Sequence, residues 1–479
     1  MRRKLFLISF SFISICSFSQ KSSIDTFLAD SSLIHASVSI CIADPDNGEI
    51  IADYNSWKSL IPASVMKLIS SAAALELLGP DYTFKTTVGY TGSLNKRSGK
   101  LTGNIVIWGG GDPALGSKNF TEHYQDFLSI WISEIKKLGI TKIEGRIISD
   151  DSYYNYIPVP DKWLWEDIGN YYGAGVYGLS VFDNMYEIHF NTSADSLHPF
   201  ITEIIPYECK SELKNWLTAS GTTDKGNVFA VPYSTNGWLV GSIPSNQEDF
   251  ILKASITNPP LLLASMLTEK LKTSGIAVSE EPATARVEQK YISEPIIRIT
   301  ETKSPTLSEI INVLNHESIN LYAETLLKEL GKRYKNESST SSGIEVVSDF
   351  LKNAGIKTEG LFIEDGSGLS PLNAVNTREL VNLLIYMKRS GKYFKEYYAS
   401  LPYAGVEGTL KGWFMDPVFD SRLKAKSGSM TRVRNYAGYF STVSGRNMVF
   451  SIIVNNYTGP SKKIISGIED ILKEITLTR

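Results

Sequence analysis

Residues 60–68 read LIPASVMKL, and the organisation of the chain is best approached from this stretch. Ser64 precedes Lys67 by three positions, and residues three apart share one face of a helix. A serine hydroxyl attacks a carbonyl carbon when a neighbouring group takes its proton, and a deprotonated lysine can do so. Because the reference pKa of lysine is about 10.4, the site must desolvate the amine or set another cation beside it. The stretch therefore predicts a nucleophile beside its base, with Val65 and Leu68 as apolar cover.

The spacing alone is weak evidence. Serine also stands three positions before lysine at residues 93, 133, 211 and 421, where a solvated helix face is the simpler interpretation. The assignment of Ser64 therefore depends on motifs further along the chain.

Length and composition indicate a soluble globular protein of several units. The chain has 479 residues, of which 42% are hydrophobic and 21% charged, and at about 150 residues per domain this suggests roughly three units. The first 20 residues combine a basic start, an apolar run and small residues, which predicts a secretory signal peptide cleaved near Ser19 or Gln20. Cleavage removes three positive charges and takes the formal net charge from -3 to -6, so no nucleic-acid partner is expected.

Hydrophobic periodicity predicts the order of the main elements. Alternating apolar residues predict a hairpin over residues 36–54, ahead of a helix that carries Ser64 and stops at Gly79. Short strand-like pieces follow up to residue 149, and residues 305–334 and 344–353 have helical periodicity. Thr377 is the expected N-cap of another helix. Residues 435–442 and 448–455 resemble antiparallel strands, and a final amphipathic helix should pack on their sheet.

Two further segments carry polar groups suited to catalysis. Ser318 and Asn320 offer a hydroxyl that can pass a proton and an amide that can hold a substrate carbonyl and a lysine. The preceding His316 invites a metal interpretation, but the second histidine of a His-Glu-x-x-His helix is absent, and no metal or cofactor is expected. Near the C-terminus, Lys426 and Ser427 could bind a terminal carboxylate, and Gly428 would let a ligand lie close to the strand.

Ser-x-x-Lys, Ser-x-Asn and Lys-Ser/Thr-Gly in this order are the signature of penicillin-recognising serine enzymes. Five separated stretches narrow the resemblance: residues 109–113 (GGGDP), 318–324 (SINLYAE), 365–370 (DGSGLS), 401–410 (LPYAGVEGTL) and 425–428 (AKSG). Together they resemble the class C low-molecular-mass penicillin-binding proteins, which are D-alanyl-D-alanine carboxypeptidases and endopeptidases.

The resemblance implies an α/β fold of the α+β kind: a β-lactamase/transpeptidase-like domain with an antiparallel sheet, flanking helices and an all-helical part, and two β-rich domains inserted. On this basis residues 21–85 and 299–479 form the catalytic domain. Residues 86–190 and 256–298 form the first inserted domain, and residues 191–255 form the second.

The resemblance also implies roles for individual residues. Ser64 is the acylated nucleophile, Lys67 its base, Ser318 a proton relay and Asn320 an orienting amide. The terminal carboxylate is bound by Lys426 and Ser427, and Gly428 leaves room for the ligand beside the strand. The oxyanion hole is formed by the backbone amides of Ser64 and Ser429. In the family, some segments form the pocket for the peptide side chain. Five residues of this chain fall near these segments: Met430, Trp163, Trp165, Asp167 and Tyr172. The aromatic residues among them could equally be plain core.

The expected substrate is a peptidoglycan peptide ending in D-Ala-D-Ala, with β-lactams as acylating inhibitors. The expected location is the periplasm, with loose membrane or cell-wall association left open. Two departures from the family pattern are Ser427 in place of threonine and Pro371 where arginine is frequent. A β-lactamase or esterase with the same residues is one alternative, although compact β-lactamases lack so long an insertion. A silent cell-wall-binding scaffold is the other, although all three motifs are intact.

Overall fold

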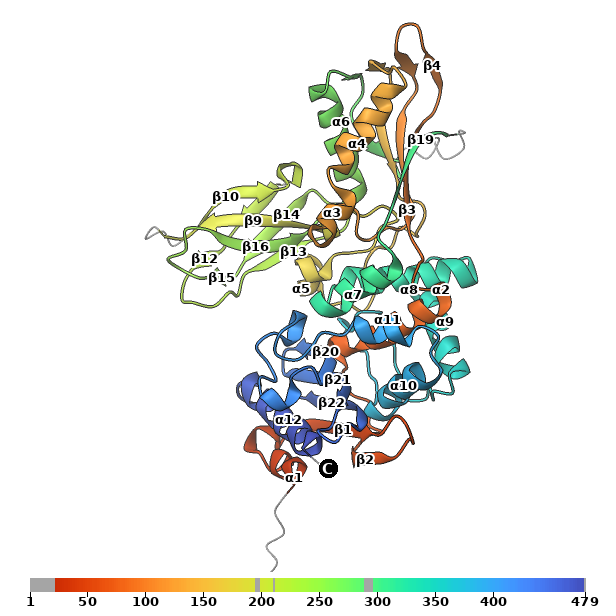
Figure 1. Ribbon diagram of the computed structural model, residues 1–479. Coiled ribbons are helices and arrows are strands. Elements are labelled where there is room, and N and C mark those ends of the chain that lie inside the picture. The colour runs from red at the N-terminus through yellow and green to blue at the C-terminus, as the bar shows by residue number, and fades with distance from the viewer. Residues whose placement is uncertain (1–21, 194–198, 210–211, 288–295, 478–479) are drawn as a thin grey trace, which may run out of the picture.

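The two ends of the chain form one five-stranded antiparallel sheet in the order β2-β1-β22-β21-β20. The computed structural model describes residues 22–193, 199–209, 212–287 and 296–477, and the expected signal peptide lies outside these ranges (Figure 1). The strands of this sheet are β1 (Ser37–Ala43), β2 (Ile50–Tyr54), β20 (Leu423–Met430), β21 (Val433–Ser441) and β22 (Asn447–Asn455). Strand β1 pairs with β2 in the predicted hairpin and with β22 from the other end of the chain. The predicted mixed α/β fold is confirmed.

Helices cover both faces of this sheet, so its central strands are apolar on both sides. Alternate residues of β1 separate accordingly: Ile40 and Ile42 pack with the C-terminal helix, whereas Cys41 packs with the core on the other face. The helices of this part are α1 (Ser23–Leu28), α2 (Lys67–Leu78), α7 (Leu307–Glu317), α8 (Asn320–Lys335), α9 (Thr340–Asn353), α10 (Thr377–Ser390), α11 (Phe394–Ala399) and α12 (Ser461–Thr476). Among the described residues, none of the helices has the length and hydropathy to cross a membrane.

Two helix starts differ from the sequence-based expectation. Ser64 lies in a 3₁₀ turn, η2 (Ala63–Met66), and α2 begins at Lys67. Helix α10 is capped by Asn376 instead of Thr377, because the Asn376 side chain accepts the N–H of Glu379. Both residue types can cap a helix, and the capping geometry decides between neighbours.

The middle of the chain forms further sheets. A five-stranded sheet has the order β18-β8-β6-β3-β19, and a four-stranded sheet has the order β17-β7-β5-β4. Their strands are β3 (Lys85–Tyr90), β4 (Ser93–Asn95), β5 (Lys100–Thr102), β6 (Ile105–Gly109), β7 (Lys142–Ile143), β8 (Ile147–Asp150), β17 (Ala277–Val278), β18 (Ala283–Thr284) and β19 (Ile297–Lys303). The helices beside them are α3 (Thr121–Tyr124), α4 (Phe127–Lys137) and α6 (Pro259–Thr273).

A smaller lobe of short strands contacts α5 (Trp165–Ile168). Its sheets have the orders β10-β9-β16, β11-β14-β13 and β12-β15. The strands are β9 (Met185–Asn191), β10 (Phe200–Ile205), β11 (Glu212–Asn215), β12 (Thr218–Ala219), β13 (Asn227–Ala230), β14 (Asn236–Val240), β15 (Ser242–Ile243) and β16 (Phe250–Ser255). In Figure 1 this lobe projects to the left of the remaining molecule.

We propose the three-part division anticipated from the sequence, with two boundaries moved. Strand β19 pairs with β3 as far as Lys303, so the first inserted part ends after this residue instead of at residue 298. Strand β9 pairs with β10 and β16, so the second inserted part begins at Met185 instead of residue 191.

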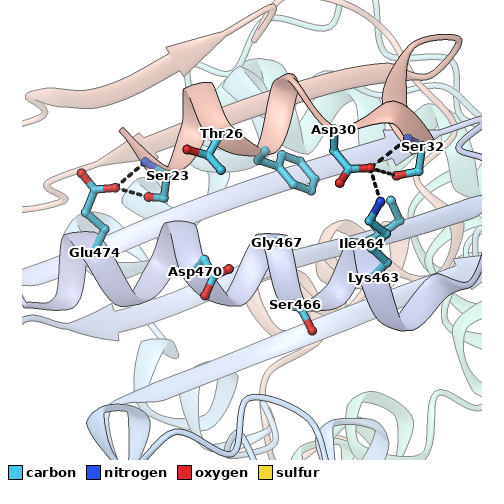
Figure 2. Close-up of a pocket in the computed structure, with 11 residues that line it drawn as sticks. Ser23, Thr26, Asp30, Ser32, Lys463, Ile464, Ser466, Gly467, Asp470 and Glu474 are labelled. Atoms are coloured by element: carbon cyan, nitrogen blue, oxygen red, sulfur yellow. Dashed lines mark hydrogen bonds and ion pairs between the residues drawn. The ribbon is translucent and has the colours of Figure 1, made fainter. Parts of the chain in front are cut away.

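The N-terminal helix α1 packs on α12 beside a cleft of about 690 Å³ (Figure 2). Figure 2 shows ion pairing and hydrogen bonding along this contact, between Lys463 and Asp30 and between Ser23 and Glu474. The close approach requires Gly467, since a Cβ at this position would lie 2.2 Å from Cδ2 of Phe27.

We expect Gly467→Val to lower the free energy of unfolding by about 1–3 kcal/mol, because the added methyl groups overlap the Phe27 ring. The measurement is urea denaturation followed by tryptophan fluorescence. Ser466→Val, at the exposed neighbouring position of α12, controls for the cost of a β-branched residue in the helix. Equal losses in the two variants would contradict the packing of Phe27 on Gly467.

Candidate active site

The side-chain amine of Lys67 is the centre of a buried polar cluster. Its Nζ lies 2.8 Å from Ser64 Oγ, 2.6 Å from Asn320 Oδ1 and 2.9 Å from the carbonyl oxygen of Ser367. The side chain is fully buried. Three segments far apart in sequence therefore meet at one nitrogen atom, and the predicted contact between Ser64 and Lys67 is present.

Burial lowers the pKa of Lys67 to about 7, although the negative charges of Asp365 and Glu324 oppose this shift. Burial penalises the charged form of an amine. A general base is most effective when its pKa lies near the working pH. Lys67 can therefore be neutral at neutral pH and take a proton from Ser64.

Side chains of strands β21 and β22 hold the backbone ahead of Ser64 through hydrogen bonds. The Ile61 N–H donates to Asn455 Oδ1 at 2.8 Å, and Asn435 Nδ2 donates to the carbonyl of Pro62 at 2.7 Å. Both asparagines are buried on β21 and β22. These bonds hold Ala63 at a φ of +45°, a region that residues with a Cβ rarely adopt and that surrounding structure must enforce. Ser64 is thus fixed by its neighbours in space and not by its own helix.

Ser318 and Lys426 form the other side of the cluster. Ser318 ends α7 with a φ of +60°, and its Oγ lies 2.9 Å from Lys426 Nζ. Lys426 is fully buried, and burial together with the charge of Lys67 lowers its pKa well below the usual range. The tight bend at Ser318 is what lets Ser318 face one lysine while Asn320 faces the other.

Strand β20 is an edge of the sheet and carries the third motif. The Ala425 N–H is donated outward, to the carbonyl of Pro402. Since backbone groups alternate along a strand, the N–H groups of Ser427 and Ser429 point to the same side. Gly428 is required here, because a Cβ would lie 2.6 Å from the Pro62 oxygen and 3.1 Å from the Ser64 nitrogen. The strand edge therefore runs directly beside Ser64.

The hydroxyl of Ser427, which replaces the usual threonine, has a defined partner. Ser427 Oγ donates to Thr409 Oγ1 at 2.8 Å. Thr409 belongs to the stretch 401–410 that resembled the family, so this contact gives that stretch a structural role beside the strand.

Two buried carboxylates that sequence reasoning did not single out shape the loop beside Lys67. Glu324 accepts the backbone N–H groups of Gly366 and Ser367. Burial and the neighbouring Asp365 raise the pKa of Glu324 to about 8. Because it holds Ser367 N, Glu324 also places the Ser367 carbonyl against Lys67. Its position four residues after Asn320, on the same helical face, was the available signal.

Asp365 is the second of these carboxylates, and it ties an inserted part to the catalytic loop. It accepts Trp163 Nε1 at 2.9 Å, the backbone N–H groups of Gly368 and Ser370, and Asn373 Nδ2 at 2.8 Å. Trp163, expected near the substrate side chain, is buried and donates its indole N–H to Asp365.

Of the other residues expected near the peptide side chain, Tyr172 contacts Asn320 directly and Asp167 contacts Tyr172. Tyr172 accepts Asn320 Nδ2 at 2.8 Å through its backbone carbonyl, and its hydroxyl is hydrogen-bonded to Asp167. Burial raises the pKa of Asp167 to about 6, and the Tyr172 hydrogen bond opposes the shift. Trp165 is half exposed, and Met430 is partly buried at the end of β20. Within the described ranges, no group of three histidine, cysteine, aspartate or glutamate side chains is placed to hold a metal ion.

We expect Asp365→Ala to lower the free energy of unfolding by about 3–5 kcal/mol, because buried donors lose their acceptor. The variant should also slow reaction at Ser64, since the loop carrying the Ser367 carbonyl loosens. Denaturation and covalent labelling of Ser64 measure the two effects. Glu364→Ala, at the partly exposed neighbouring position, is the matched control, and an equal loss there would refute the role given to Asp365.

Comparison with known proteins identifies the family of the chain. The model of the D-Ala-D-Ala carboxypeptidase 3 (S13) family matches residues 20–475. A D-alanyl-D-alanine carboxypeptidase of an Actinomadura species is 28% identical over 452 residues, 91% of this chain and 81% of the relative. D-alanyl-D-alanine carboxypeptidase DacB of Haemophilus influenzae is 24% identical over 426 residues, 86% of this chain and 84% of the relative.

The fold is shared with a solved structure. The crystal structure of penicillin binding protein 4 from Haemophilus influenzae superposes with a TM-score of 0.80 at 20% identity, covering 92% of this chain and 96% of that one. The family match spans nearly the whole length and includes every motif described above, so the chain belongs to the D-Ala-D-Ala carboxypeptidase 3 (S13) family.

Proposed function

We propose that this protein is a serine-type D-alanyl-D-alanine carboxypeptidase/endopeptidase that cuts peptidoglycan peptides through an acyl-enzyme on Ser64. The observation that carries the assignment is the buried Lys67 amine, with a pKa of about 7, 2.8 Å from Ser64 Oγ. Membership of the family supplies the reaction class.

In the first half-reaction, Lys67 takes the proton of Ser64 as Oγ bonds to the carbonyl carbon of the penultimate D-alanine. Negative charge develops on the carbonyl oxygen, which the backbone N–H groups of Ser64 and Ser429 would stabilise. The proton then passes through Ser318 to the leaving nitrogen, the C–N bond breaks, and D-alanine departs. In the second half-reaction, water gives a proton to Lys67 as its oxygen bonds to the acyl carbon. The bond between this carbon and Ser64 Oγ then breaks, and Lys67 returns the proton to Oγ.

Substrate positioning follows from the strand edge. A peptide lying along β20 would add a strand to the sheet through the outward N–H groups of Ser427 and Ser429. Its terminal carboxylate would meet Lys426 and the Ser427 hydroxyl. Asp167 and Tyr172 lie on the Asn320 side, where the peptide side chain would project. We assign them to specificity.

A β-lactam presents an acylating carbonyl to the same nucleophile, so this protein should bind penicillins covalently. The crystal structure of the Haemophilus influenzae penicillin binding protein 4 has also been obtained with a β-lactam. We further propose export by the N-terminal signal peptide and action in the periplasm. The β-lactamase or esterase alternative predicts rapid deacylation, and the silent-scaffold alternative predicts no acylation.

Ser64→Ala is expected to abolish acylation by benzylpenicillin with little change in melting temperature, because the nucleophile is lost and a small polar group is removed. Intact-protein mass spectrometry with peptide mapping measures this directly. Ser93→Ala, which alters another serine three positions before a lysine, should react as the unaltered protein does. An adduct persisting in Ser64→Ala would reject the assignment, and a transient adduct in the unaltered protein would support the β-lactamase alternative.

The acylation rate should fall by about tenfold per pH unit below about 7, because protonated Lys67 cannot accept a proton. Above this pH the rate should level off. Lys67→Arg should be inactive across the range, since a guanidinium stays charged, whereas Lys411→Arg at an exposed position should keep the profile. Stopped-flow acylation with a chromogenic β-lactam provides the measurement, and a rate independent of pH between 5 and 8 would exclude Lys67 as the base.

A further inference from the structure

One sheet face of the smaller lobe carries partly exposed aromatic rings. In the sheet β11-β14-β13, Val228 and Leu239 point to the buried side. Their neighbours along the strands, Phe229 and Trp238, point outward. Phe229 lies directly opposite Trp238 on the adjacent strand, and Trp238 lies directly opposite the exposed Lys214. The outward side of this sheet is therefore aromatic where solvent-facing strands usually carry polar residues.

Trp165 from helix α5 extends this line of rings. Its ring centroid lies 5.8 Å from that of Phe229 and 6.2 Å from that of Trp238, and the Phe229 and Trp238 rings are 6.0 Å apart and within 14° of parallel. Trp165 is 50% exposed. We call Trp165, Phe229, Trp238 and Lys214 the aromatic row.

A chain of hydrogen bonds links helix α5, which carries one ring of the aromatic row, to the candidate active site. Helix α5 carries both Trp165 and Asp167, and Asp167 is hydrogen-bonded to the Tyr172 hydroxyl. The Tyr172 carbonyl in turn accepts Asn320 Nδ2. The aromatic row is therefore held at a fixed position relative to Asn320.

We propose that the aromatic row binds the glycan strand of peptidoglycan while an attached peptide occupies the active site. This inference rests on the proposed function. The C–H face of a pyranose ring is apolar and flat, so it stacks on exposed aromatic rings, and the ring hydroxyl and acetamido groups accept hydrogen bonds. The Lys214 ammonium at the far end of the row is a donor for such groups.

A glycan fits this surface better than a protein partner does. Each aromatic side chain contributes about 150–250 Å² when fully buried, so three partly covered rings offer less than the about 800 Å² per partner of a stable protein interface. Several successive sugars matched to successive rings need no larger surface.

The test measures binding of a peptide-free N-acetylglucosamine tetrasaccharide to the full chain by isothermal titration calorimetry. We expect Trp238→Ala and Trp165→Ala each to weaken binding by about fivefold or more. Trp108→Ala removes a tryptophan that is 47% exposed on β6 and should leave binding unchanged. Lys214→Ala, an exposed strand position, gives a second variant that folds independently of ring packing, and it should weaken binding more modestly.

A second readout separates this inference from the proposed function. Hydrolysis of a soluble peptide ending in D-Ala-D-Ala reports on the active site, and release of D-alanine from purified sacculi reports on both sites. The ratio of sacculus to soluble-peptide rates should fall in Trp238→Ala and not in Trp108→Ala.

The outcomes are distinct. Tetrasaccharide binding that is absent in the unaltered protein, or equal in Trp238→Ala, would overturn the aromatic row as a glycan site even if the soluble peptide is cut. If glycan binding depends on Trp238 but the protein neither hydrolyses the soluble peptide nor is acylated by penicillin, the proposed function is rejected and the glycan site stands.

Discussion

The burial of one lysine amine is the constraint on which the active site depends. A charged Lys67 in this position would need strong compensation, and the nearby carboxylates Asp365 and Glu324 supply some of it while desolvation still dominates. The balance leaves the pKa of Lys67 near neutrality, where an amine can accept a proton and later return it. Every segment around it contributes either cover or a hydrogen-bond partner, so the chemistry of Ser64 is a product of packing.

Much of the fold could be predicted from local patterns. The β1–β2 hairpin, the C-terminal strand pair and the stripe of the last helix follow from hydrophobic periodicity and turn residues. The sequence also named the residues that the structure brings together at Lys67. It could not supply the two boundaries that we propose to move, the end of the first inserted part and the start of the second, because pairing of β19 with β3 and of β9 with β16 joins residues far apart in the chain. Local propensity does not specify such partners.

The supporting groups of the site were missed for the same physical reason. Asn435 and Asn455 read as ordinary polar positions within strands, and their importance appears only when the backbone at residues 61–62 is seen beside them. Trp163 was grouped with residues near the substrate, yet its indole N–H is committed to Asp365. A residue's type and neighbours in sequence indicate what it can donate, whereas the fold decides which acceptor receives it.

The pairing of β1 with β22 has a consequence for biosynthesis. Ser64 and Lys67 are made early, but the sheet that holds them in place is completed by the last three strands, β20 to β22. Contacts of such long sequence separation form late, because the entropy cost of closing the long loop must be met before the contacts can stabilise the fold. A nascent or truncated chain ending before residue 423 thus lacks Lys426, the asparagine anchors and the strand edge. The site around Lys67 is therefore complete only after these last strands have been made and the sheet has formed.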